Sequence, residues 1–157
     1  MSRKTIAILL ATTTATVVFL TLKEKAEAYM TVLKWDPIIK RVIPKDVPSS
    51  LVKAIIWVES KGNPYLVGRD GEIGLMQILP STAQDLGIDN PNLLFDPVVN
   101  IRTGANYLRY QLKRYGGNIK DAIAAYNAGS ARKYNGVYVN QDYVNKVLNA
   151  YKVLRFV

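Results

Sequence analysis

Residues 51–58 read LVKAIIWV, a run that is apolar on almost every side when it is wound into a helix. A helix without a polar face is stable only where other elements cover it. Ser49 or Ser50 precedes the run and can cap its free backbone N–H groups, and the helix is expected to end near Ser60. The segment therefore predicts a fold in which further helices surround residues 51–60.

Helix start and stop signals recur along the rest of the chain. Aspartate, serine or asparagine stands where a helix would begin, and glycine or proline stands where it would end. These signals, which include a capping box at residues 81–84, predict further helices over residues 36–42, 81–86, 96–115, 118–128 and from Asn140 or Gln141 onward. Asn135-Gly136 favours a small hairpin or a loop. We therefore expect one all-α domain over residues 29–157, with at most a small β-hairpin.

The first 28 residues are expected to be a separate unit. Arg3 and Lys4 precede the uncharged residues 5–22, and a small-x-small triplet ends at Ala28. This order is typical of an export signal cleaved after Ala28, but the uncharged run is also long enough to be a retained transmembrane anchor. Both alternatives place residues 29–157 outside the cytoplasm, because the basic flank stays inside. An anchor would add association with the inner membrane through residues 5–22.

Composition excludes several kinds of chemistry. The chain has neither Cys nor His, which excludes disulfides, thiol catalysis, Ser-His-Asp triads and His-held metals. We expect no metal and no cofactor, so acid–base catalysis at neutral pH must use carboxylates, Tyr or Lys. The formal net charge of +9 suits an anionic partner, such as a nucleic acid, an anionic membrane or an acidic wall polymer.

Glu59 is the first candidate for acid–base catalysis. It is one of two glutamates in residues 29–157, and it shares a helical face with Val52 and Ile55 near the end of the apolar helix. Burial and the negative pole of the helix both raise the pKa of a carboxyl group in that place. The result is an acid that keeps its proton near neutral pH, as a general acid must. The alternative is a glutamate that turns to water or pairs with Lys61.

Three short blocks follow one another in the sequence: ES at residues 59–60, GLMQ at 74–77 and AYNAG at 125–129. This ordered set resembles the soluble lytic transglycosylase domain, a relative of goose-type lysozyme, over residues 47–147. The resemblance implies a lysozyme-like fold. It also implies cleavage of the bond between N-acetylmuramic acid and N-acetylglucosamine in peptidoglycan, with 1,6-anhydro ends. A muramidase that hydrolyses the same bond and an inactive wall-binding module are the alternatives.

The resemblance also implies roles for the matching residues. Glu59 would be the single catalytic acid and base, helped by the acetamido group of the substrate. Tyr126 would hold the Glu59 carboxyl group through its hydroxyl. Core packing is the alternative for Tyr126 and for Met76. The substrate-binding candidates beside Tyr126 are Ser60, Met76, Gln77, Asn127 and Tyr143.

The chain departs from the family pattern in the loop before GLMQ. Gly68 stands where the family commonly has a serine, and Glu72 stands where a small residue is usual. Val139 stands where the family often has an acid, four residues before Tyr143. A hydrolase would need a second carboxylate to steer water, for which Glu72 and Asp70 are the candidates. The alternative is that both are solvated loop charges.

These observations favour peptidoglycan glycan strands as the partner of the chain. Export and the lack of a basic recognition helix argue against nucleic acid. We expect a monomer in the periplasm or at the cell surface, and a phage virion is an alternative location. A wall-remodelling enzyme, a secretion-system accessory and a phage protein that opens the wall would share these features.

Overall fold

The computed structural model describes residue 27 and residues 29–156. Residues 5–22, which we expect to be a signal or an anchor, lie outside the described residues. Within the described part, no helix is both long enough and apolar enough to cross a membrane.

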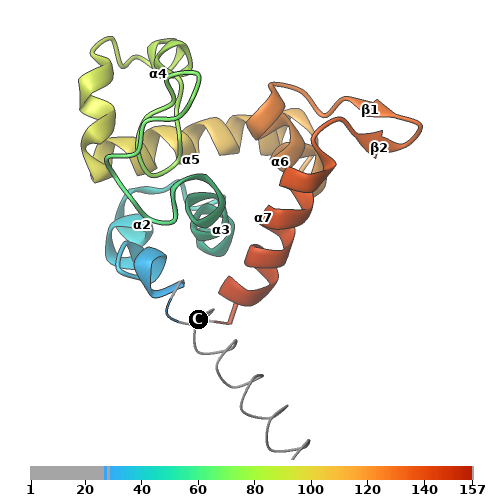
Figure 1. The fold of residues 1–157 in the computed structure, drawn as a ribbon, viewed down its shortest axis with the longest axis horizontal. Coiled ribbons are helices and arrows are strands. Elements are labelled where there is room, and N and C mark those ends of the chain that lie inside the picture. The colour runs from blue at the N-terminus through green and yellow to red at the C-terminus, as the bar shows by residue number, and fades with distance from the viewer. Residues whose placement is uncertain (1–26, 28, 157) are drawn as a thin grey trace, which may run out of the picture.

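The described chain is mainly helical, as predicted (Figure 1). Residues 29–33 are helical, and the named elements follow them. These are α2 (Asp36–Val42), α3 (Ser49–Ser60), α4 (Pro80–Asp85), the 3-10 helix η1 (Pro91–Phe95), α5 (Pro97–Arg114), α6 (Ile119–Ala128), β1 (Lys133–Tyr134), β2 (Val137–Tyr138) and α7 (Gln141–Leu154). The two strands pair antiparallel across Asn135-Gly136, and both turn residues have positive φ, as this hairpin turn requires.

Helix α3 is the central helix of the domain, as its apolar sequence predicts. It packs against α2 and α7, and Figure 1 shows α5 passing across the same region. Its one charged residue within the apolar run, Lys53, is only 3% exposed and forms an ion pair with Asp36 at 3.2 Å. Five apolar side chains of α3 have no exposed surface: Leu51, Val52, Ala54, Ile55 and Ile56.

The helix caps follow the sequence at α5 and α6 and differ from it at α2, α3 and α4; the residue before α2 is Trp35, and Asp36 does not cap that helix. The side chains of Asp96 and Asn118 accept backbone N–H bonds at the starts of α5 and α6, as predicted. The predicted serine cap of α3 and the capping box at residues 81–84 are wrong, because neither α3 nor α4 has a side-chain cap. Both helices begin one residue or more earlier, at Ser49 and at Pro80, so the serines lie inside the first turn.

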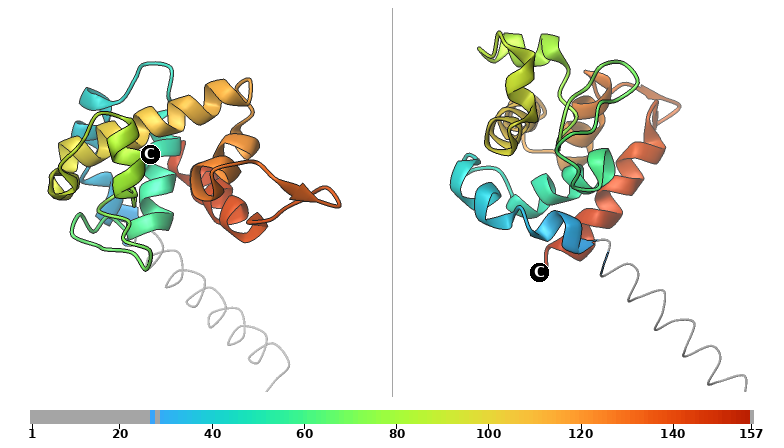
Figure 2. Two further views of the ribbon diagram at one scale, coloured as in Figure 1. Left: turned by 90° about the horizontal axis from the view of Figure 1, so that it is seen from above. Right: turned by 60° about the vertical axis from the view of Figure 1, so that its left-hand side comes forward.

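The loop of residues 61–79, between α3 and α4, has a structure that the helix signals did not predict. Val67 bridges to Ile73, and Ile73 bridges to Ile78, so the loop folds back on itself twice. Figure 2 shows this green segment beside the end of α3. Gln77 holds a positive φ of 47° at the last fold. The loop therefore brings the GLMQ block next to Glu59.

Candidate active site

Two hollows meet at Glu59. The first, of about 550 Å³, lies between the loop 61–79, α5 and α6, and the second, of about 620 Å³, lies between α3, α6 and α7. Glu59 and Asn127 line both. The first also contains Arg69, Glu72, Gln77, Tyr107 and Tyr126, and the second contains Trp57, Lys61, Tyr143 and Lys146. Together they form a cleft that continues on both sides of one carboxyl group.

Glu59 is the penultimate residue of α3 and is partly buried. Tyr143 of α7 donates a hydrogen bond from its hydroxyl to Glu59 Oε1 at 2.6 Å. Burial raises the pKa of Glu59 to about 7, and the charge of Glu72 acts in the same direction, whereas the Tyr143 bond and the charge of Lys61 lower it. The carboxyl group therefore carries its proton in a substantial part of the molecules at neutral pH.

Tyr126 does not hold Glu59, which corrects the role that the resemblance implies. Its hydroxyl donates to the carbonyl oxygen of Met76 at 2.9 Å, and a phenol has only one hydrogen to give. Its ring lines the first hollow and lies 5.3 Å from the ring of Tyr107. Burial raises the pKa values of Tyr126 and Tyr143 well above the ordinary value of a tyrosine, and the charge of Glu59 raises both further. Both hydroxyls therefore remain hydrogen-bond donors at neutral pH.

Ser60 and Met76 are placed in the interior rather than on the cleft, which corrects their predicted contact with substrate. The Ser60 hydroxyl is 4% exposed and lies 2.7 Å from the carbonyl oxygen of Leu75, to which it donates. The Met76 side chain is fully buried against Gly104, where an added Cβ would lie 2.5 Å from its sulfur. Both residues fix the loop 61–79 from behind, so their effect on the cleft is indirect.

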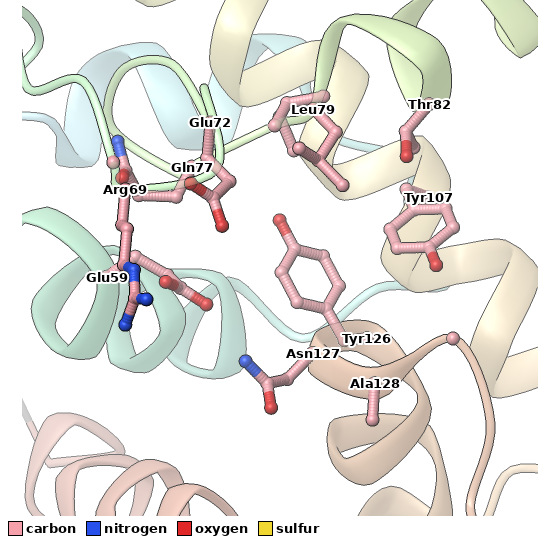
Figure 3. Close-up of a pocket in the computed structure, with 13 residues that line it drawn as sticks. Glu59, Arg69, Glu72, Gln77, Leu79, Thr82, Tyr107, Tyr126, Asn127 and Ala128 are labelled. Atoms are coloured by element: carbon pink, nitrogen blue, oxygen red, sulfur yellow. The ribbon is translucent and has the colours of Figure 1, made fainter.

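Gln77 and Asn127 lie on the cleft, where the sequence places them (Figure 3). Gln77 Nε2 donates to the carbonyl oxygens of Leu66 and Gly74, at 3.0 and 2.9 Å, which leaves its oxygen for the cleft. Asn127 Oδ1 accepts a bond from Asn140 at 2.8 Å, which leaves its amide N–H groups for a ligand. Their contact with substrate stays a prediction.

Glu72 and Asp70 differ in position, although the sequence offers both as a second carboxylate. Glu72 lines the first hollow, and Figure 3 shows its carboxylate directed toward the space between Glu59 and Tyr126. Asp70 is exposed and does not line that hollow, and its backbone N–H donates to Glu72 Oε2 at 3.0 Å. Glu72 is therefore the carboxylate that the loop adds to the cleft.

Asn100 is a site-supporting residue that the sequence reasoning missed. It is fully buried in α5, where Nδ2 donates to the carbonyl oxygens of Ile73 and Leu94, both at 2.8 Å, and Oδ1 accepts from Met76 N–H at 2.8 Å. A polar residue beside Ile101 on the apolar face of α5 is the signal that could have found it. The same signal, a polar group at a core position, pointed to Glu59.

No group of three or more acidic, His or Cys side chains converges in the described part of the chain to hold a metal ion. The cleft offers one partly protonated carboxylic acid, a neighbouring carboxylate, hydroxyls, amides and lysines. Such an acid can give a proton to a leaving oxygen and can take one back when it is ionised.

Comparison with known proteins gives a consistent match. The family model described as the transglycosylase SLT domain matches residues 36–148. The transglycosylase of Enterobacteria phage PRD1 is 34% identical over 120 residues, which are 76% of this chain and 43% of the phage protein. The soluble lytic murein transglycosylase of Escherichia coli K12 is 38% identical over 108 residues, which are 64% of this chain and 17% of that enzyme.

Solved structures agree with the sequence matches. The 70-kDa soluble lytic transglycosylase in complex with bulgecin A superposes with a TM-score of 0.59 at 34% identity, over 76% of this chain and 19% of that one. An inactive glutamate-to-glutamine mutant of the lytic transglycosylase Slt from Pseudomonas aeruginosa gives 0.59 at 28% identity, over 68% of this chain and 21% of that one. This chain spans less than half the length of each of these proteins.

Proposed function

Because this chain belongs to the transglycosylase SLT domain family, we propose that it cleaves the glycan strands of peptidoglycan as a lytic transglycosylase. The bond cut would be the one between N-acetylmuramic acid and N-acetylglucosamine. The observation that carries the proposal is the Glu59 carboxyl group, with a pKa of about 7, at the meeting point of two hollows. A glycan strand that lay through both hollows would place a glycosidic bond from within the strand beside that group.

Glu59 would act twice in one catalytic cycle. In its protonated form it would give a proton to the glycosidic oxygen, while the acetamido oxygen of the substrate stabilises the sugar cation. The Glu59 carboxylate would then take the proton of the C6 hydroxyl, whose oxygen attacks C1 and closes the 1,6-anhydro ring. The attacking hydroxyl is tethered to the sugar, so no water and no enzyme nucleophile are needed.

The residues around Glu59 support this cycle in different ways. The Tyr143 hydroxyl bond fixes one carboxyl oxygen at 2.6 Å. Lys61 and Lys146 of the second hollow give the cleft positive charge that suits an anionic wall polymer. Gln77 offers its amide oxygen to the sugars, and Asn127 offers its amide N–H groups.

Hydrolysis is the second candidate, and the position of Glu72 favours it. Its carboxylate lines the same hollow as Glu59, where a second carboxylate could activate water. Two products distinguish the candidates, because a 1,6-anhydro end lacks the one water that a reducing end has gained.

The test is to digest purified peptidoglycan with the purified protein and to weigh the released muropeptides. We expect mainly 1,6-anhydro products from the wild-type chain and at least about a hundredfold less product from a Glu59→Gln variant. Mainly reducing, hydrated products would identify a muramidase instead. An unbroken wall with retained binding would identify a wall-binding module.

We also propose an exported location, in the periplasm, at the cell surface or in a phage virion. The relatives of the chain support export, since they include a membrane-bound lytic murein transglycosylase of Buchnera aphidicola as well as the phage protein. Residues 5–22 would act as a cleaved signal or as an anchor. Determining the N-terminal residue of the protein recovered from cells separates the two, since cleavage after Ala28 would leave Tyr29 first.

A further inference from the structure

Side-chain atoms of two other residues fill the space beside Gly68. Its φ is not positive, so any residue could adopt its backbone conformation. An added Cβ, however, would lie 2.3 Å from Glu72 Oε2 and 2.6 Å from Gln77 Oε1. Two side-chain oxygens of the cleft thus occupy the place that a side chain at position 68 would fill.

The turn itself directs the Glu72 carboxylate to that place. Gly68 N–H donates to the Glu72 carbonyl oxygen at 2.7 Å, and Gly71 N–H donates to the Gly68 carbonyl oxygen at 3.3 Å, which closes the loop. Asp70 N–H then donates to Glu72 Oε2 at 3.0 Å. The carboxylate is therefore folded back over its own turn toward Gly68, on the side of the first hollow.

We propose that Gly68 and Glu72 act as a pair, in which the missing side chain at position 68 admits the Glu72 carboxylate into the cleft as a positioning residue whose negative charge faces Glu59. The proposal rests on the role proposed above for Glu59. It gives one explanation for both departures from the family pattern, Gly68 and Glu72, since a serine at position 68 and a glutamate at position 72 would compete for the same space.

The surroundings of Glu59 give Glu72 a task. Tyr143 and Lys146 face the cleft from α7, Tyr126 and Asn127 from α6, Lys61 from the end of α3, and Arg69 from the loop. Among the described lining residues, Glu72 is the sole anion besides Glu59, against three cations. Cations favour the ionised form of a carboxyl group, and the Glu72 charge opposes them.

Both steps proposed for Glu59 benefit from this charge. A neighbouring anion holds the proton on Glu59 to a higher pH, so more molecules begin the cycle with the acid ready. After Glu59 has given up its proton, the same repulsion makes the carboxylate a stronger base for the C6 hydroxyl. Glu72 thus acts through Glu59 and need not contact the substrate.

The first test is the pH dependence of peptidoglycan cleavage by the full chain with Glu72→Gln. The amide keeps the size of the side chain and an oxygen that can accept the Asp70 N–H bond, but it removes the charge. We expect the alkaline limb of the activity profile to move to lower pH by about half a unit to one unit. Asp70→Asn removes a charge from the same loop outside the hollow, and it should leave that limb in place.

The second test substitutes Gly68 alone and then Gly68 together with Glu72. Gly68→Ser alone should lower activity about tenfold or more, because the added atoms overlap the Glu72 carboxylate and force the loop 61–79, which also carries Gln77, out of place. Adding Glu72→Ala should recover most of the loss, with an alkaline limb like that of Glu72→Gln. Melting curves of each variant show whether the fold is retained.

Two results would overturn the pairing: a Glu72→Gln profile equal to wild type, or a double variant no more active than Gly68→Ser. Either would leave Glu72 as a cap of its own turn. Failure of the proposed function has a different signature, which is an unbroken wall, or mainly hydrated products, with the wild-type chain.

Discussion

The two sides of the cleft act on Glu59 in opposite ways. On the side of the second hollow, here called the α7 side, the Tyr143 hydroxyl donates a hydrogen bond to the carboxyl group at 2.6 Å, and Lys61 adds a positive charge. Both lower the pKa of Glu59. On the loop side, the charge of Glu72 raises it. Burial is larger than any of these effects and sets the pKa near 7. The difference teaches that contact and charge are separable controls on one acid, since each side can be changed without the other.

The largest effect is expected for the group that both sides share. Glu59→Gln should lower peptidoglycan cleavage by about 10²–10⁴-fold, because one residue serves as acid and as base. Glutamine has nearly the same size, so the helix packing and the far-ultraviolet circular dichroism should not change. Cleavage within threefold of wild type, with an unchanged spectrum, would remove Glu59 from the mechanism.

The same pair of proteins should differ in the pH dependence of stability. The folded-state pKa of Glu59 lies above the unfolded value of 4.5, so the stability gained from its proton is fully present below that value and is lost as pH rises through about 7. Glu59→Gln should therefore gain stability over wild type between those values, by about 1–3 kcal/mol at pH 8. Urea unfolding at pH 4 and at pH 8 measures this. If the stability difference between the two proteins were the same at both pH values, folding would not raise the pKa of Glu59.

The α7 side is tested alone by Tyr143→Phe. Losing the hydroxyl removes a hydrogen bond to the ionised carboxyl group, so the pKa of Glu59 should rise and the alkaline limb of the activity profile should move up. We expect an activity loss of about tenfold at most near pH 7, since a hydrogen bond to a charged group contributes about 1.5–3 kcal/mol and part of it is recovered by the easier protonation. A limb that moves to lower pH would reverse the assignment of the α7 side.

The smallest effect is expected on the loop side, from Tyr126→Phe. The lost bond to the Met76 carbonyl oxygen should lower the free energy of unfolding by about 0.5–1.5 kcal/mol, with a modest loss of activity. The alkaline limb of the activity profile should stay in place, whereas that of Tyr143→Phe should move. If Tyr126→Phe moved the limb and Tyr143→Phe did not, the two tyrosines would have to exchange roles.

The sequence predicted well the features that depend on neighbours along the chain. The apolar run before Glu59, the caps at Asp96 and Asn118 and the turn at Asn135-Gly136 all follow from local rules, and the structure has them. A partly buried acid at the end of α3 was predictable because a polar residue at an apolar position is visible in the sequence alone.

The remaining features depend on contacts between distant residues. Tyr143 reaches Glu59 across 84 positions, and Tyr126 reaches Met76 across 50, so periodicity gives no reason to choose between the two tyrosines as the partner of Glu59. The double fold of the loop 61–79 depends on Asn100, which lies on another helix. The direction of Glu72 depends on the room that is left because Gly68 has no side chain, which the sequence alone does not show.

The most direct measurement is the pKa of Glu59 itself. Carboxyl-carbon resonances of the folded protein, followed by NMR across pH 3–9 and assigned with Glu59→Gln, report the protonation of that one side chain. The account predicts a midpoint at about 7, with a lower midpoint in Glu72→Gln and a higher one in Tyr143→Phe. A midpoint near the ordinary value of 4.5 in the wild-type protein would contradict it, because Glu59 would then hold no proton to donate at neutral pH.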